Sequence, residues 1–255
     1  MKIIAINGSH SGKRGYTHFL IEKLFSGARK ENAECEEIVL ATSNIKVCKG
    51  CSICNTEKHL LKCIYEEKDD VAMIFNKMRE ADIIIYATPI YIFNMSGIMK
   101  IFLDRMNSTG NSEDFRLSKS GLFFHQISKE IYSKPFVTLI CHDSFENESS
   151  KNVISYFKTF SKFMDAKRVG TIVRRLGKLT GHGKDLEKEM KYPKISESYI
   201  AIELAGKELA TKGKISRRNQ KIASQDIIHV PFFSILKNFR PFKKGILEKL
   251  KEGNV

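Results

Sequence analysis

Five short apolar runs alternate with amphipathic segments along the first 210 residues. The runs consist almost wholly of Ile, Val, Leu, Ala and aromatic residues, which is typical of strands buried on both faces of a parallel sheet. Strands are predicted over 2–6, 37–40, 82–88, 136–141 and 169–173. Strand 82–88 is the most apolar, which predicts a central position, and it is expected to end at Pro89.

The segments between the strands carry apolar residues at i, i+3 and i+4, the spacing of a helix with one buried face. Helices are expected to begin near 17, 69 and 96, with two more over 153–164 and 195–210. This fivefold alternation builds a parallel sheet covered by helices on both faces, and it suits the flavodoxin-like order better than a six-stranded dinucleotide fold. The segment 107–134 is polar and is predicted to be irregular.

The predicted organisation is a flavodoxin-like domain over 1–210, with a cysteine-rich loop at 43–68, and a basic C-terminal extension over 211–255. The extension holds eleven Lys or Arg against three acidic residues, so it supplies most of the net charge of +14. Its apolar, proline-containing segments at 230–233 and 239–242 are expected to pack on the domain or on a neighbouring subunit.

A basic extension fits contact with nucleic acid, an anionic membrane or an acidic partner. We favour a lysine-rich surface at an oligomer contact, so a homodimer or homotetramer is expected and nucleic-acid binding is not. No apolar run reaches the roughly 20 residues of a membrane span. The N-terminus turns polar after Ile6, too early for a secretory signal, so a cytoplasmic location is expected.

The loop after the first strand predicts an anion site. It joins a strand to a helix N-terminus, where unpaired backbone N–H groups and the helix dipole attract a phosphate. Ser9 and Thr17 offer hydroxyls, and Lys13 and Arg14 offer positive charge. The loop matches neither the Walker A spacing nor G-x-G-x-x-G, which argues against an ATPase or an ordinary NAD-binding domain. A glycine-rich turn that only caps the helix is the alternative interpretation.

An apolar, aromatic loop follows the third strand, at the sheet edge where ligands bind in this architecture. Tyr91 and Phe93 there suggest a flat ligand, and backbone amides could bond the edge of a heterocycle. Core packing of each aromatic side chain is the alternative.

Four of the six cysteines lie within sixteen residues, as C-x2-C-x2-C followed by a fourth. A disulfide framework is not expected in a reducing compartment, whereas clustered thiolates select an iron–sulfur cluster or zinc. The compact spacing favours a [4Fe–4S] cluster over zinc. A loop without cofactor and a redox pair such as Cys51–Cys54 remain open. The predicted ligands are Cys48, Cys51, Cys54 and Cys63.

The loops after the first and third strands are similar in sequence to those of a known family. They resemble the NAD(P)H-dependent FMN reductases of the flavodoxin-like class, and the cysteine loop between them resembles the branch called iron–sulfur flavoproteins. The resemblance covers roughly residues 1–175. The chain departs from the family pattern at His10-Ser11, at Tyr16 and in the longer spacing between Cys54 and Cys63. The residues that carry it are Gly8-Ser9, Gly15-Tyr16-Thr17, Thr88-Pro89-Ile90-Tyr91, Ser96-Gly97, Lys100 and Phe102-Leu103-Asp104-Arg105.

The resemblance implies an FMN site. It places the phosphate at Ser9, Gly15, Tyr16 and Thr17, with Lys13 and Arg14 as further candidates. It places the ring at the third-strand loop and at the loop after the fourth strand. The implied ring contacts are Pro89, Ile90, Tyr91, Ile92, Phe93, Asn94, Ser96, Gly97 and His142.

The function implied is an FMN-dependent NAD(P)H oxidoreductase with a quinone, a flavin or another small molecule as acceptor, in which the [4Fe–4S] cluster relays electrons. The flavin carries the hydride chemistry, so no catalytic side chain is predicted. The first alternative is an electron carrier that exchanges with a ferredoxin-like partner and uses no nicotinamide. The second is a nucleic-acid or membrane adaptor that uses the basic extension.

Overall fold

The computed structural model describes residues 1–227 and 239–251. The chain divides into two compact units, Met1–Gln225 and Asp226–Val255. Helix α10, Arg240–Lys251, is the described element of the second unit. The apolar segment at 230–233, for which packing on the domain or a neighbour is expected, lies outside the described residues.

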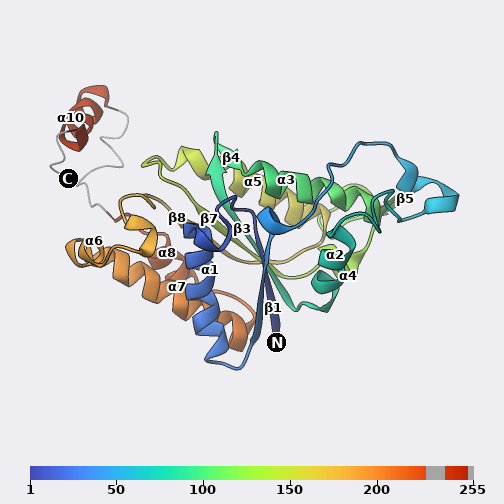
Figure 1. Cartoon of the computed structure of the whole chain (residues 1–255), viewed down its shortest axis with the longest axis horizontal. Helices are drawn as coiled ribbons and strands as arrows, with labels where there is room; N and C mark the ends of the chain where they lie inside the picture. Colours follow the sequence, from blue (N-terminus) through green and yellow to red (C-terminus); the bar gives the residue numbers. More distant parts are fainter. Residues whose placement is uncertain (228–238, 252–255) are drawn as a thin grey trace. The chain divides into compact units, whose positions relative to one another are not determined.

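The first unit is built on the predicted parallel sheet, with strand order β2-β1-β3-β7-β8 (Figure 1). All four pairings between these five strands are parallel. The prediction of a flavodoxin-like, five-stranded parallel sheet with helices on both faces is therefore confirmed. The strands are β1 Lys2–Asn7, β2 Glu34–Val39, β3 Ile83–Tyr91, β7 Phe136–Cys141 and β8 Arg168–Arg174.

Helices cover both faces of the sheet (Figure 1). One face carries α1 Tyr16–Arg29, α7 Pro193–Lys212 and α8 Arg217–Ala223. The other carries α2 Val71–Glu80, α3 Gly97–Asp104 and α5 Glu148–Phe163. The short helices are α4 Lys129–Tyr132, α6 Leu186–Lys191, η1 Gly12–Arg14, η2 Leu40–Thr42, η3 Ile53–Asn55, η4 Glu57–His59, η5 Arg105–Thr109 and η6 Gly181–Gly183.

The core follows from the alternation of side chains along the strands. Ile4 and Ile6 of β1 and Ile84 and Tyr86 of β3 point to the face of α2, α3 and α5 and are almost fully buried there. On the opposite face α1 and α7 approach so closely that a Cβ added to Gly27 would lie 1.7 Å from the carbonyl oxygen of Glu203. Only glycine permits this backbone contact.

The prediction that the third strand ends at Pro89 is wrong. β3 continues to Tyr91 and turns back into β4, Asn94–Met95, which pairs antiparallel with it. Ile92 and Phe93 form the two-residue turn, both with positive φ, 45° and 62°. Such a turn is normally made by Asn or Gly, so the sequence contains no signal for it.

The segment predicted to be irregular also contains a hairpin, β5 Gly110–Leu117 with β6 Phe123–Ile127. Phe115 and Phe123 are exposed, whereas Phe124 packs against the ring of Phe163 and Ile127 is buried. Because few apolar side chains of the hairpin are buried, its strands lack the alternating apolar pattern by which a strand is recognised.

The first unit extends past the predicted boundary at 210. Helix α8 packs on α7 and β8, held by the fully buried Arg174, whose Nη1 donates to the carbonyl of Ala223 at 2.9 Å and to Ser198 Oγ at 2.9 Å. Residues up to Gln225 therefore belong to this unit. None of the described helices is both long and apolar enough to cross a bilayer.

Candidate functional site: a cleft at the strand ends and a cysteine pocket beside it

The loop after β1 is held in shape by a buried asparagine. Asn7 Oδ1 accepts a hydrogen bond from Ser9 N at 2.8 Å, and Asn7 Nδ2 donates to Glu37 Oε1 at 2.7 Å. Glu37 in turn contacts His18 Nδ1 at 2.6 Å. A chain of polar contacts therefore runs from β2 and α1 to the backbone of the loop and fixes its path.

The N-terminus of α1 opens on this loop. Its N-cap residue, Gly15, makes no side-chain capping bond, so the first N–H groups of the helix keep their capacity to bind an anion. Ser9 and Thr17 are buried beside it, and Thr17 Oγ1 lies 3.2 Å from Cys141 Sγ. The residues predicted to bind a phosphate are therefore grouped around this helix end, and the binding itself stays a prediction.

A cleft begins at this helix end and extends across the ends of four neighbouring strands. It is bordered by the loops after β1, β3, β7 and β8, the sheet edge where ligands of such folds bind. Arg14 and Lys184 supply positive charge, and Lys184 Nζ donates to the carbonyl of Arg14 at 3.0 Å. The cleft is lined by Ser9, Ser11, Arg14, Gly15, Tyr16, Thr17, Pro89, Ile90, Tyr91, Cys141, His142, Asp143, Gly181, His182 and Lys184.

Most of the predicted phosphate residues line the cleft, but Lys13 does not. Lys13 is exposed on the short helix η1, so a direct contact with the ligand stays a prediction. Tyr16 lines the cleft, and its hydroxyl lies 3.2 Å from the hydroxyl of Tyr199 on α7. Burial raises the pKa of Tyr16 well above its usual value, so this phenol stays protonated.

The third-strand loop divides into two parts. Pro89, Ile90 and Tyr91, three of the predicted ring contacts, line the cleft. Ile92 and Phe93, at the hairpin tip, are 90% and 64% exposed and are not among the lining residues. Asn94 and Gly97 are also exposed and do not line the cleft. Their predicted contacts with a ring stay predictions.

Ser96 is fully buried and connects the two loops. Its Oγ donates to the carbonyl of Gly8 at 2.5 Å and accepts from Met99 N at 3.3 Å, which caps helix α3. Its backbone N donates to Thr88 Oγ1 at 3.1 Å. Ser96 thus holds the loop after β1 and the loop after β3 in register rather than facing the cleft.

His142 closes the cleft on the β7 side. It is 8% exposed, and both ring nitrogens are buried without a hydrogen-bond partner among the described residues. Burial, assisted by the charge of Arg175, lowers the pKa of His142 to about 4, so the ring is neutral at pH 7. A neutral imidazole has one donor and one acceptor nitrogen.

The loop at 181–184 is a part of the cleft that the sequence patterns did not predict. Gly181, His182 and Lys184 reach the cleft from the segment after β8. His182 Nε2 lies 3.5 Å from Asp143 Oδ1 on the β7 loop. The sequence does contain one signal for this loop: glycines at 177, 181 and 183 indicate tight turns next to a strand end.

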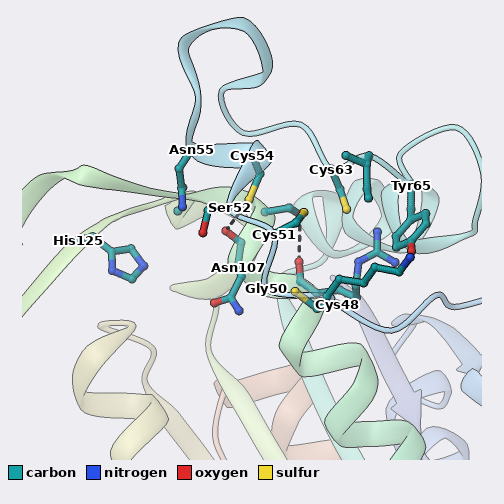
Figure 2. Close-up of a pocket in the computed structure, with 15 residues that line it drawn as sticks. Cys48, Gly50, Cys51, Ser52, Cys54, Asn55, Cys63, Tyr65, Asn107 and His125 are labelled. Atoms are coloured by element: carbon teal, nitrogen blue, oxygen red, sulfur yellow. Dashed lines mark hydrogen bonds between the residues drawn. The ribbon is translucent and has the colours of Figure 1, made fainter.

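All four clustered cysteines line a second pocket (Figure 2). Figure 2 shows their sulfur atoms around one space, with Tyr65 near Cys63 and His125 on the opposite side. Cys54 Sγ lies 3.8 Å from the carbonyl oxygen of Asn107. Burial raises the pKa of Cys54, and the three neighbouring thiols raise it further. The pocket lies at the C-terminal end of α3, whereas Ser96 lies at its start.

Carboxylates close the base of the cysteine loop. Asp69 Oδ2 accepts from Lys46 N at 3.0 Å, and Asp70 Oδ2 accepts from Asn44 N at 2.7 Å. Asp69 also forms a buried ion pair with Arg105, the residue that follows α3. Residues 44–46 and 69–70 are therefore held side by side, and the cysteines lie on the loop between them.

Arg105 belongs to the family motif, but the sequence alone indicates no role for it. Burial lowers the pKa of this guanidinium, but its bond to Asp69 and the charges of Cys63 and Asp69 more than offset that effect, so the net pKa is raised. Its Cζ lies 5.4 Å from the centre of the Tyr65 ring. Arg105 therefore stays charged beside the thiols.

As the four thiols are placed, no three of their sulfur atoms lie within 4.8 Å of one another. Zinc binds sulfur at about 2.3 Å, so its ligands lie within about 4.6 Å of one another. Among the described residues, the group of three or more candidate ligands within 4.8 Å is His18, Glu22 and Glu37, and it includes no cysteine. All six cysteines are in the described part of the chain and are free thiols. Four thiols around one pocket are donors of the type that iron–sulfur clusters and zinc both use.

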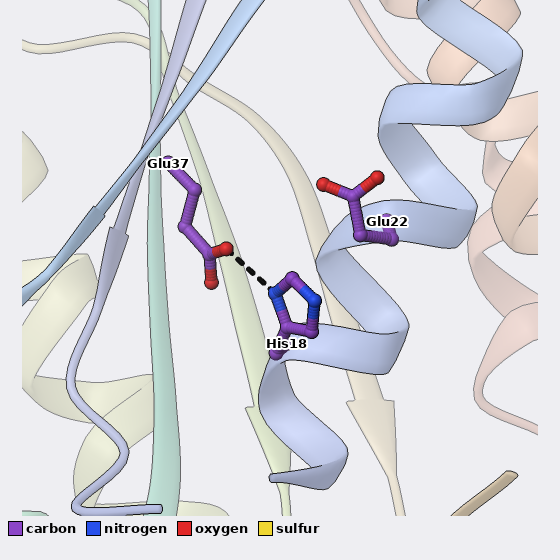
Figure 3. Close-up of side chains that lie close together, drawn as sticks. All are labelled: His18, Glu22 and Glu37. Carbon is purple, nitrogen blue, oxygen red and sulfur yellow. Dashed lines mark hydrogen bonds and ion pairs between the residues drawn. The ribbon is translucent and has the colours of Figure 1, made fainter. Parts of the chain in front are cut away.

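The group at His18, Glu22 and Glu37 is explained by ordinary hydrogen bonding (Figure 3). Glu37 is occupied by Asn7 and His18, and Glu22 accepts from Arg29 Nη1 at 2.9 Å. We assign no metal to it.

The sheet order and the cleft at its strand ends define a flavodoxin-like α/β protein. Residues 1–127 match the family described as NADPH-dependent FMN reductase. Through these residues the chain belongs to that family, which confirms the resemblance seen in the sequence.

Three known proteins illustrate the relationship. An iron-sulfur flavoprotein of Archaeoglobus fulgidus is 41% identical over 105 residues, which are 41% of this chain and 48% of that protein. An iron-sulfur flavoprotein of Clostridioides difficile aligns over the full length of both chains at 24% identity. The structure of an FMN-dependent NADH-azoreductase from Bacillus anthracis in complex with FMN has a TM-score of 0.56 at 14% identity, covering 82% of this chain and 99% of that one.

The azoreductase comparison supports the fold alone, because its identity is low. The chain spans about half the length of the first curated relatives that it matches. The activity of those relatives is therefore not assigned to this chain on similarity alone.

Proposed function

We propose that the protein is an FMN-dependent oxidoreductase that takes electrons from NAD(P)H and passes them through a [4Fe–4S] cluster to an acceptor. The observation that carries the proposal is the cleft itself. An uncapped helix N-terminus, an apolar Pro89–Tyr91 edge and the neutral ring of His142 border one space at the strand ends. These features fit the phosphate, the flat ring and the polar edge of FMN in turn.

The protein's part in the reaction is binding and orientation. The first N–H groups of α1, with Ser9 and Thr17, would hold the phosphate. Pro89, Ile90 and Tyr91 would lie along the ring, and His142 would offer one donor and one acceptor to its edge. FMN when bound supplies hydride acceptance and the release of electrons.

The cysteine pocket supports the second part of the proposal. Cys48, Cys51, Cys54 and Cys63 would each supply one thiolate to the cluster. Helix α3 begins after Ser96 and ends at Asp104, just before Arg105 of the cysteine pocket. The cleft and the cysteine pocket therefore belong to the same unit of the chain.

The test is the spectrum and composition of anaerobically purified protein. We expect bound FMN, about four iron atoms per chain with matching sulfide, and bleaching of the flavin absorbance by NADPH. Cys63→Ser is expected to lose iron and keep FMN. Cys35→Ser, which changes a cysteine on β2 away from the pocket, is the matched control and is expected to keep both.

The alternative function, an electron carrier without nicotinamide, shares the cysteine pocket and gives a different result. Bleaching only by a reduced ferredoxin would support that function. Protein that contains no FMN and takes none up on reconstitution would refute the whole proposal.

A further inference from the structure

Arg105 joins the two ends of the cysteine loop. Its Nη1 donates to the carbonyl of Lys46 at 2.9 Å and to the carboxylate of Asp69. Lys46 precedes the first cysteine of the cluster motif, and Asp69 follows the last one, Cys63. One guanidinium, 2% exposed, therefore fixes where the loop leaves the domain and where it returns.

The same side chain has an unused donor. Its Nε is buried and has no hydrogen-bond partner among the described residues. Arg105 is also one of the residues that line the cysteine pocket. A buried N–H that belongs to a cation is costly to leave unpaired, so a native structure normally provides an acceptor for it. The sulfur of Cys63, which lines the same pocket, and a group bound there are the available acceptors.

We propose that Arg105 is a positioning residue for the cluster, with its Nε–H directed to sulfur at the Cys63 corner and its charge held there by Asp69. The inference rests on the proposed function, because it concerns the cluster. Hydrogen bonds to cluster sulfur and nearby positive charge stabilise the more negative, reduced state. Arg105 therefore raises the midpoint potential for one-electron reduction.

A purely structural role gives a different expectation. If Arg105 only joined the loop ends through Nη1, its replacement would change stability or iron content and leave the potential of the loaded cluster unaltered. The potential is thus the measurement that separates the two roles.

The principal variant is Arg105→Lys, which keeps the positive charge opposite Asp69 and removes the Nε donor. Arg116→Lys is the matched control. Arg116 also forms a largely buried ion pair, with Asp165 at 2.6 Å, and its Nε is likewise without a partner among the described residues. It lies outside the lining of the cysteine pocket. Each variant is prepared anaerobically as the full chain, with iron and sulfide measured.

The potential is measured by dithionite titration monitored by electron paramagnetic resonance. We expect Arg105→Lys to retain wild-type iron and to show a more negative midpoint potential, with Arg116→Lys unchanged. An unaltered potential in Arg105→Lys at full iron content, or an equal shift in both variants, would overturn the inference. Wild-type protein without iron would instead defeat the proposed function.

A second variant is used if the Arg105→Lys protein does not bind the cluster. Arg105→Met combined with Asp69→Asn removes both buried charges together, while the Asn amide oxygen can still accept from Lys46 N. After chemical reconstitution we expect this variant to shift the potential in the same direction as Arg105→Lys, because it also lacks the Nε donor. A reconstituted double variant with the wild-type potential would contradict the proposal.

Discussion

Replacing Ser96 by alanine removes the hydroxyl that connects the two loops of the cleft. The change costs the N-cap of α3, typically about 1 kcal/mol. It also leaves the carbonyl of Gly8 without its 2.5 Å donor at a fully buried position, which costs about 1–3 kcal/mol more. We therefore expect the free energy of unfolding to fall by about 2–4 kcal/mol.

Ser216→Ala is the matched control for this change. Ser216 caps α8 by accepting from Asn219 N at 3.2 Å, and it touches neither loop of the cleft. Its loss is expected to cost about 1 kcal/mol, the capping contribution alone. Urea unfolding of FMN-free protein measures both variants.

Affinity for FMN gives a second measurement on the same variants. Because Ser96 sets the loop after β1 against the loop after β3, Ser96→Ala is expected to bind FMN more weakly, and Ser216→Ala is expected to bind it as the wild type does. Fluorescence quenching of FMN on titration reports this. Equal losses of stability in the two variants, or an unchanged affinity in Ser96→Ala, would refute the reasoning.

Two further predictions concern the helix layer and the response to acid. Gly27→Ala is expected to lower the free energy of unfolding by about 3 kcal/mol or more, because its Cβ would meet the Glu203 backbone. Gly97→Ala is the control, because nothing lies within 4 Å of a Cβ at that position. Urea unfolding should give this control a stability near that of the wild type. The pKa of His142 falls from 6.5 to about 4 on folding, so protonation of this ring favours the unfolded state. The free energy of unfolding is therefore not reduced by His142 above about pH 6.5, and it falls by up to about 3 kcal/mol as the pH drops toward 4 and below. His142→Phe should flatten the dependence of unfolding free energy on pH in that window, and an unchanged slope would contradict the assignment.

Local patterns along the chain are sufficient to predict the sheet and its helices. The strands buried on both faces are continuous apolar runs, and the helices carry one apolar face each, so both signals lie within a few neighbouring residues. The glycine-rich junction before α1 and the spacing of Cys48, Cys51 and Cys54 are also local. The amino-acid sequence alone therefore indicates an anion site and a cluster of thiols.

Contacts between distant segments depend on the folded chain. The hairpin tip at Ile92 and Phe93 adopts positive φ against the preference of its residues, because β4 pairs with the end of β3. Residues 181–184 join the cleft only because β8 lies beside β7. Arg105 and Asp69 are 36 positions apart in sequence and meet because α3 ends beside the base of the cysteine loop. Such pairings depend on packing across the whole domain, and no periodicity along the chain encodes them.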